Sequence, residues 1–287
     1  MNAKQACLAL SRNISHKKRD SLEQTICQDA EFSFRYAKYF IEGRFELGEA
    51  AICQSTEWSF WYAQDVIGGR WEPGEAVISK DPVCALNYAK DVIGGRWEPG
   101  EAVISRDAEC ALDYAKDVIC GRWEPGEAAI SKDAGLSFCY ARDVLRRRFK
   151  LGEPEICQDD WASYMYARSV IQGRWKLGEN VICQDEQQAY GYALNVIGGR
   201  FPPGEAAISK SEHYAFLYAK QVIRENWTRK LAMMCPCWLY TYAEDVIKGR
   251  LPTVMHNKMI SFGIIDSENK YVKKYCGSKK YSKKTAV

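Results

Sequence analysis

The sequence has few of the residues and none of the motifs that most enzymes need. Its three histidines, His16, His213 and His256, are scattered through 287 residues, and the chain contains no glycine-rich phosphate loop and no nucleophile elbow. Catalysis requires one unique group of nucleophile, base and stabilising residues, whereas the polar residues here recur. The sequence therefore predicts no catalytic residue, no cofactor and no enzymatic activity.

Long apolar segments are also missing. No stretch reaches the roughly 18 uncharged apolar residues that a membrane-spanning helix needs, and residues 1–18 contain no apolar run of signal-peptide length. We therefore expect a cytoplasmic protein with no membrane partner. The net charge is only +3, with acidic and basic residues interleaved. This balance argues against a strongly charged nucleic-acid-binding body.

The chain is built instead from a repeated unit. Tyr-Ala pairs recur every 26 residues, and a ninth pair follows after 24, at Tyr242. The first eight tyrosines of these pairs are Tyr36, Tyr62, Tyr88, Tyr114, Tyr140, Tyr166, Tyr192 and Tyr218. Counted from the tyrosine, most units have arginine at position eight, an aromatic residue at nine, Gly-Glu at twelve and thirteen, and isoleucine at sixteen. A repeat of this length predicts stacked supersecondary units.

Position nineteen predicts the start of a helix, because its side-chain oxygen can accept a hydrogen bond from a free helix N–H. The residues there are Ser55, Asp81, Asp107, Asp133, Asp159, Asp185 and Ser211. Pro82, at a first helical position, agrees with this start. Within the helix, one apolar stripe should hold Ala111, Ala115, Val118 and Ile119, while Lys116 and Asp117 face away.

The end of this helix and a second helix follow from the next residues. Glycine pairs such as Gly68-Gly69 and Gly94-Gly95 are typical helix ends. The Trp-Glu-Pro-Gly-Glu segment predicts a turn, and Glu-Ala-Val-Ile-Ser-Lys predicts a short second helix of about two turns. Neither helix can bury its apolar stripe alone. The predicted fold is all-α, an α-solenoid of about nine 26-residue helix-turn-helix repeats.

Three regions are expected along the chain. Residues 1–35 form an N-terminal cap, in which Glu23, Ile26, Cys27 and Asp29 match the repeat while residues 16–19 replace its turn. Residues 36–260 form the solenoid, although the eighth unit loses the Gly-Glu step. Residues 261–287 form a basic tail, which we expect to be flexible, with one possible short strand at 263–265.

Twelve cysteines raise the question of metal or disulfide chemistry. Several stand where other units have serine, which favours a structural role as a small, half-buried side chain: Cys27, Cys53, Cys157, Cys183 and Cys235. Cys235 and Cys237 with His256 could bind zinc, but the usual spacing between paired cysteines is absent. The sequence therefore predicts no metal site, and without a secretory signal it predicts no disulfides.

The recurring arginine and glutamate have two interpretations. They could form a binding ladder, or an internal tie between turn and helix. A residue present in every unit is most simply explained by what every unit must do, which is to pack on its neighbour. An arginine beside a tryptophan also favours a stacked guanidinium. We therefore prefer the internal tie.

Units that depart from the pattern are more informative about binding. The fifth unit breaks the usual glycine turn with Arg146, Arg147 and Arg148, and Ser169 replaces an acidic residue in the sixth. The basic residues there predict a contact patch for an acidic protein surface or nucleic-acid phosphates, although a solvated charged face remains the alternative. The candidate binding residues are Arg142, Arg146, Arg147, Lys150 and Arg168, and in the tail Lys273, Lys274, Lys279 and Lys280. The tail could track phosphates or serve only for solubility.

The unit Tyr-Ala-x-Asp-Val-Ile-x-Gly-Arg-Trp-x-x-Gly-Glu-x-x-Ile-x-x-Asp resembles tandem helical repeats in uncharacterised bacteriophage proteins. This resemblance covers residues 20–260 and implies a phage-encoded, non-enzymatic protein in the host cytoplasm. It carries over no catalytic or ligand residue. We expect a repeat scaffold that presents an extended surface to a host or viral protein. A nucleic-acid-binding protein that uses the patch at residues 142–148 and the tail is the alternative.

Overall fold

The computed structural model describes residues 3, 5, 6 and 16–223, and these fold as an all-α repeat protein. No strand occurs within these residues. Each 26-residue unit contributes two helices, as the sequence predicted. The predicted fold class, an all-α helical-repeat solenoid, is therefore confirmed.

The first helix of each repeat begins where the sequence predicted. Asp81, for example, accepts a hydrogen bond from the Cys84 N–H at 2.9 Å, and Pro82 is the first helical residue. Such a cap satisfies one of the free N–H groups at a helix start. These helices are α3 (Ala30–Tyr36), α5 (Thr56–Tyr62), α7 (Pro82–Asn87), α9 (Ala108–Asp113), α11 (Ala134–Cys139), α13 (Asp160–Tyr166), α15 (Glu186–Tyr192) and α17 (Glu212–Leu217).

The second half of this helix differs from the prediction, because it continues as a π-helix. Ile119 N–H donates to the Tyr114 carbonyl, five residues back, at 2.9 Å. A π-turn is wider than an α-turn, so the apolar stripe is displaced: Ala111 and Ala115 are buried, but Val118 and Ile119 are only partly buried. The π-segments are η1 (Ala37–Ile41), η2 (Ala63–Ile67), η3 (Tyr88–Ile93), η4 (Tyr114–Val118), η5 (Tyr140–Leu145), η6 (Ala167–Ile171), η7 (Ala193–Ile197) and η9 (Tyr218–Ile223).

A left-handed residue ends most π-segments. Gly68 and Gly94 have φ of 70°, which confirms the predicted glycine caps. Arg146 takes the same conformation, with φ of 51°. The prediction that the fifth unit breaks the turn is therefore wrong: its arginine adopts the glycine conformation, and the Arg147 N–H still reaches back to the Ala141 carbonyl at 3.3 Å.

In the first four repeats the second helix starts earlier than predicted. In α6 the Glu-Pro-Gly-Glu residues are already helical, so the predicted turn at Trp-Glu-Pro-Gly-Glu is wrong there. Proline fits there because the first turn of a helix has free N–H groups. In the later repeats the second helix begins at the predicted glutamate, which is Glu153, Glu179 or Glu205. These helices are α4 (Glu46–Ile52), α6 (Glu72–Ile78), α8 (Glu98–Ile104), α10 (Glu124–Ile130), α12 (Glu153–Ile156), α14 (Glu179–Ile182) and α16 (Glu205–Ile208), the last preceded by a 3₁₀ turn, η8 (Pro202–Gly204).

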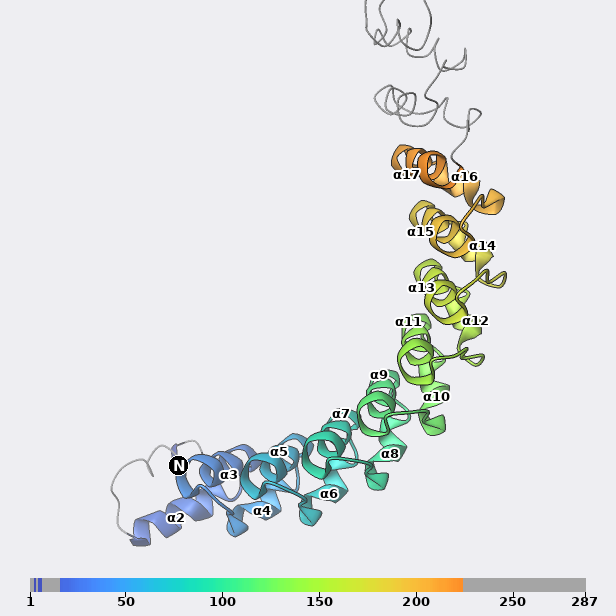
Figure 1. Cartoon of the computed structure of the whole chain (residues 1–287). Coiled ribbons are helices and arrows are strands. Elements are labelled where there is room, and N and C mark those ends of the chain that lie inside the picture. Colours follow the sequence, from blue (N-terminus) through green and yellow to red (C-terminus); the bar gives the residue numbers. More distant parts are fainter. Residues whose placement is uncertain (1–2, 4, 7–15, 224–287) are drawn as a thin grey trace, which may run out of the picture. The chain divides into compact units, whose positions relative to one another are not determined.

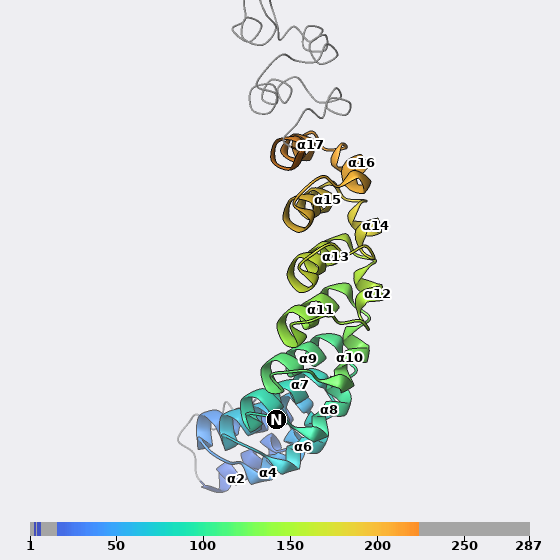
Figure 2. The same cartoon turned by 45° about the vertical axis from the view of Figure 1, so that its right-hand side comes forward.

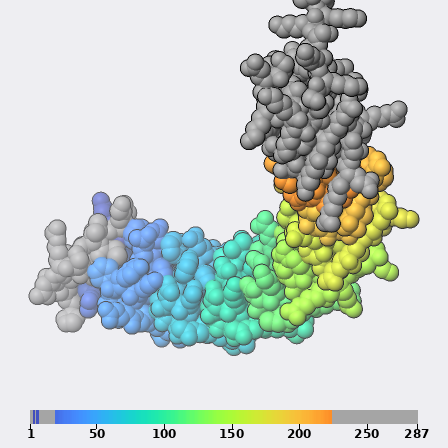
Figure 3. Space-filling view, turned by 45° about the horizontal axis from the view of Figure 1, so that its top comes forward, coloured from blue at the N-terminus to red at the C-terminus, as the bar shows by residue number. Residues whose placement is uncertain are grey.

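The chain divides into two compact units, Met1–Glu155 and Ile156–Val287. Within the first unit, α3, α5, α7, α9 and α11 pack side by side in one layer, and α4, α6, α8 and α10 form a second layer (Figures 1 and 2). In the second unit, α13, α15 and α17 form the first layer, and α14 and α16 pack against it. Repeats follow one another in chain order within each unit, as the colours of the space-filling view show (Figure 3).

Residues that recur in every repeat form the core of each unit. The repeated tyrosine and the alanine after it have at most 1% exposed surface, and the isoleucine of the second helix has none. The aromatic ring at position nine covers the glycine at position twelve. A Cβ on Gly100 would lie 2.6 Å from the Trp97 ring, so only glycine fits beneath this ring.

The N-terminal cap follows the repeat register more closely than its sequence suggests. Residues 16–19, which stand in place of the repeat's turn, begin the helix α2 (His16–Ile26), which packs on α3 and α4. Ile26 is fully buried, Glu23 accepts a hydrogen bond from the Tyr36 hydroxyl at 2.6 Å, and Asp29 caps α3. The predicted register of Glu23, Ile26 and Asp29 is confirmed.

Several predictions concern residues that the structure does not describe. The ninth repeat, the departures of the eighth unit after residue 223, the strand at 263–265 and the basic tail all lie outside the described residues. Among the described residues, no helix is long and apolar enough to cross a membrane.

Candidate interaction surfaces

A hydrogen-bonded network joins neighbouring repeats within each unit. The guanidinium of Arg96 binds both carboxylate oxygens of Glu101, with Nε–Oε1 at 2.7 Å and Nη2–Oε2 at 3.1 Å. The hydroxyl of Tyr114, in the following repeat, donates to Glu101 Oε1 at 3.0 Å and accepts from the backbone N–H of Trp97 at 3.0 Å. One tyrosine hydroxyl thus satisfies both a carboxylate and a buried N–H of the preceding repeat.

The same network recurs in both units. The arginine–glutamate pairs are Arg44–Glu49, Arg70–Glu75, Arg96–Glu101, Arg122–Glu127, Arg148–Glu153, Arg174–Glu179 and Arg200–Glu205. The tyrosine hydroxyls that donate to these glutamates include those of Tyr62, Tyr88, Tyr114, Tyr140, Tyr192 and Tyr218. The prediction of an internal tie is confirmed, and the tie extends beyond its own repeat.

Burial and charge shift the pKa values of this network. Burial raises the pKa of Tyr114 and of Tyr192 to about 12, because a phenolate would be poorly solvated there. The hydrogen bond from Arg122 lowers the pKa of Glu127, and the charge of Arg147 adds to this effect. At neutral pH Tyr114 and Tyr192 are therefore protonated, and Glu127 is ionised.

At the surface of the first unit, two ion pairs connect the π-segments of neighbouring repeats. Lys38 donates to Asp65 at 2.6 Å, and Lys90 donates to Asp117 at 2.6 Å. Each lysine lies two residues after the repeated tyrosine, and each aspartate lies three residues after the tyrosine of the next repeat. An aspartate of the next repeat thus neutralises each of these two lysines.

Neutral hydrogen bonds take this role in the second unit. Asn195 donates from Nδ2 to the Tyr164 hydroxyl at 2.9 Å, and the Tyr190 hydroxyl donates to Gln221 Oε1 at 3.0 Å. Asn195 and Gln221 occupy the same repeat position as Asp65 and Asp117. The position is therefore retained as a contact to the preceding repeat, although its charge is lost.

The candidate basic residues have different surroundings. Arg142 binds both oxygens of Asp143, at 2.6 and 2.7 Å, and its guanidinium lies 4.8 Å from the centre of the Phe138 ring. In the second unit, Arg168 donates to the Tyr164 hydroxyl at 3.3 Å. Both side chains therefore already have partners within their own units.

Arg146, Arg147 and Lys150 are exposed, and among the described residues none of the three forms an ion pair. They line two separate hollows of the first unit. Arg146 lines one with Lys116, and Arg147 and Lys150 line the other with Arg122. These three residues of the predicted patch therefore lie in two hollows, because the left-handed turn at Arg146 points them in different directions. The tail candidates Lys273, Lys274, Lys279 and Lys280 lie outside the described residues.

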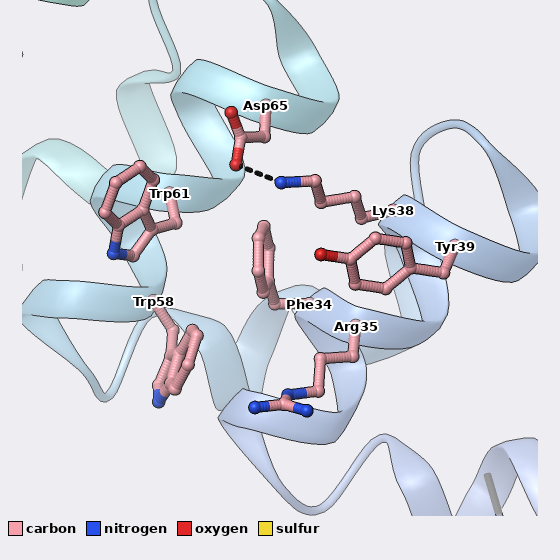
Figure 4. Close-up of a pocket in the computed structure, with 7 residues that line it drawn as sticks. All are labelled: Phe34, Arg35, Lys38, Tyr39, Trp58, Trp61 and Asp65. Carbon is pink, nitrogen blue, oxygen red and sulfur yellow. Dashed lines mark hydrogen bonds and ion pairs between the residues drawn. The ribbon is translucent and has the colours of Figure 1, made fainter. Parts of the chain in front are cut away.

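An aromatic pocket on the first two repeats was not predicted from the sequence. It has a volume of about 300 Å³ and lies over α3, η1, α5 and η2. Trp58 and Trp61 lie at one side, Tyr39 at the other and Phe34 between them (Figure 4). The Lys38 ammonium is 5.5 Å from the Phe34 ring centre and 5.4 Å from that of Tyr39, which places the ion pair with Asp65 at the edge of the pocket.

Two of these aromatic side chains are well exposed. The exposed fraction is 63% for Tyr39 and 38% for Trp61. A signal for them was present in the sequence, because Tyr39 stands where the following repeats have Asp65, Asp91 or Asp117. What the sequence could not indicate is that these departures from the pattern meet at one place.

The cysteines and possible metal ligands form no further site in the described part of the chain. Cys27, Cys53, Cys157 and Cys183 are half-buried, as predicted. No group of three or more potential metal ligands occurs among the described residues. Cys235, Cys237 and His256 lie outside them.

Comparisons with known proteins give no match to a protein-family model, a curated protein or a solved structure.

Proposed function

We propose that the protein is a non-enzymatic repeat scaffold that binds another protein through side chains that depart from the repeat pattern. The observation that carries this proposal is the exposed aromatic pocket of Phe34, Tyr39, Trp58 and Trp61. Tyrosine and tryptophan are enriched at the energetically important centres of protein interfaces, because they bury a large area and lose little conformational entropy.

The use of the repeated polar residues supports the same proposal. Arginine, glutamate and tyrosine of each repeat are engaged with one another, so they serve stacking. Binding specificity is then left to positions that vary between repeats, such as Tyr39 and Trp61. The resemblance to bacteriophage repeat proteins makes the partner of this scaffold a host or viral protein in the host cytoplasm.

The test is an affinity capture with the full chain and a double variant, Tyr39→Ala with Trp61→Ala. A partner should be captured by the wild type in the presence of nuclease and high salt, and it should be lost with the double variant. The control is Leu177→Ala, since Leu177 is 60% exposed in the second unit. Equal capture by the double variant and the wild type would contradict the proposal.

A nucleic-acid-binding role is the second candidate. It is favoured by the exposed cations Arg146, Arg147 and Lys150, which have no ion pair among the described residues. Binding to DNA or RNA should then weaken steeply with salt, because bound cations release counterions from the phosphates. Deletion of residues 268–287 should weaken it further. Binding that ignores salt and this deletion would exclude the second candidate.

A further inference from the structure

One turn of the first unit reverses the charge of its predecessors. In the four repeats before it, the equivalents of Arg147 are glycines and the equivalents of Lys150 are glutamates, which are Glu46, Glu72, Glu98 and Glu124. The fifth repeat thus gains one positive charge and replaces one negative charge by a positive one. All repeats need the turn for stacking, so stacking alone does not account for this change.

The changed side chains face a hollow of about 410 Å³ that lies wholly within the first unit. Arg122, Arg147, Arg148 and Lys150 supply four cations to its lining, with Glu127 as the only acidic residue of that lining. Leu151, which is 54% exposed, adds an apolar surface. The hollow is therefore basic and partly apolar.

The four cations are prepared for binding in two ways. Glu127 and Glu153 hold Arg122 and Arg148 in fixed positions through bidentate pairs, with the arginine side chains still about half exposed. Arg147 and Lys150 are exposed and have no ion pair among the described residues. A ligand would thus meet two fixed guanidinium groups and two exposed cations that form no ion pair among the described residues.

We propose that this hollow binds an acidic segment of a partner protein, with carboxylates against Arg147 and Lys150 and an apolar side chain against Leu151. The proposal rests on the scaffold function and names the chemistry of one partner segment. Charge complementarity favours an anionic ligand. A protein segment fits better than single-stranded nucleic acid, because the one aromatic residue of the lining, Phe149, is 3% exposed and cannot stack with bases.

The test measures binding of a fluorescent peptide of about twelve residues, made of aspartate and glutamate with two leucines, to the full chain. The decisive variant combines Arg147→Gly with Lys150→Glu, which recreates the turn of the preceding repeat, Gly121 and Glu124, and should therefore fold. We expect the double variant to bind the peptide about tenfold more weakly than the wild type. The basic tail is common to both proteins, so the difference reports on the hollow.

A second variant controls for total charge. Lys80→Gln with Lys210→Glu removes the same net charge at two exposed positions that do not line the hollow, and it should leave peptide binding within about twofold. A peptide with serine in place of leucine should bind the wild type more weakly. Equal loss in both variants, or no effect of the leucines, would overturn the proposal.

Two other occupants give distinct results. Tighter binding of a single-stranded oligonucleotide of equal charge, lost in the Arg147→Gly/Lys150→Glu variant, would assign the hollow to nucleic acid and overturn the proposal. Self-association that this variant abolishes in sedimentation would assign it to a second copy, with the same consequence. If aromatic-pocket variants still lose a captured partner while the peptide fails to bind, only the inference about the hollow is wrong.

Discussion

Neighbouring repeats are joined by different surface contacts in the two units, although their buried contacts are the same. Two junctions of the first unit have an ion pair, Lys38–Asp65 and Lys90–Asp117, whereas the second unit has neutral hydrogen bonds, as between Tyr190 and Gln221. The inner network of arginine, glutamate and tyrosine is the same in both. The comparison shows which part of the repeat tolerates a change of chemistry and which part does not.

Burial explains the difference. The side chains of Lys90 and Asp117 are 48% and 34% exposed, so water can replace either partner, and such exposed pairs contribute about 0–1 kcal/mol. By contrast, Tyr114 is fully buried, and its hydroxyl satisfies a carboxylate and a backbone N–H. A buried polar group that loses its partner costs about 1–3 kcal/mol, which restricts this position to tyrosine.

The largest effect should come from alkaline pH, which should unfold both units. The folded-state pKa of Tyr114 and of Tyr192 is about 12, above the value of about 10 for an unfolded tyrosine. Their stabilisation is fully present below about pH 10 and is lost as the pH rises toward about 12. Circular dichroism and tyrosinate absorbance should change together. If only part of the helical signal were lost, one unit would remain folded at alkaline pH. That result would contradict the prediction that both units depend on the same tyrosine network.

A matched pair of variants sharpens the comparison of the inner network. Tyr114→Phe in the first unit and Tyr192→Phe in the second should each lower the free energy of unfolding by about 2 kcal/mol, because each leaves a buried backbone N–H without its acceptor and removes one hydrogen bond from a carboxylate. Urea denaturation measures both. Tyr39→Phe, at an exposed hydroxyl, is the control and should cost little. Clearly unequal costs for the matched pair would show that the units differ inside as well as outside.

The left-handed turns offer a second matched pair with an effect of opposite sign. Arg146 and Gln172, one in each unit, have φ of 51° and 54°. Arg146→Gly and Gln172→Gly should each raise the free energy of unfolding by about 1 kcal/mol, since glycine adopts this conformation without strain. Thermal unfolding would detect the gain. Arg147→Gly is the control, because its φ is not positive and no gain is expected.

The smallest effect is expected from variants of the surface contacts that differ between the two units. Lys90→Ala should slightly lower the urea midpoint at low salt, and this loss should disappear in high salt as the ion pair is screened. Tyr190→Phe should have a similar effect that salt does not change. Urea denaturation at two salt concentrations measures both losses. If the stability loss of Tyr190→Phe also depended on salt, the two units would not differ in the type of their surface contact.

Local chemistry made much of the fold predictable. Asp81 and Gly68 indicate a helix start and a helix end by themselves, and both are confirmed. The hydrophobic pattern, in contrast, did not reveal the π-segments, because a short π-turn displaces the apolar stripe by too little to identify in a few residues. The helical Glu-Pro-Gly start was missed because proline and glycine are also typical of turns.

The site was less predictable than the fold, because it depends on contacts between repeats. Arg96 and Glu101 are five residues apart and could be recognised as a tie, but their third partner, Tyr114, belongs to the next repeat. The aromatic pocket likewise joins Tyr39 with Trp61 of the following repeat. Sequence identifies such departures one by one, and only packing brings them together.

The tyrosine bridge also limits how a gene for such a protein can change its length. Each hydroxyl contacts residues 13 and 17 positions earlier, across the boundary between two repeats. Recombination that adds or deletes whole 26-residue copies preserves every bridge, whereas a break at any other spacing leaves a glutamate and an amide without a hydroxyl. Gain or loss of whole copies is thus the change of length that leaves these bridges intact.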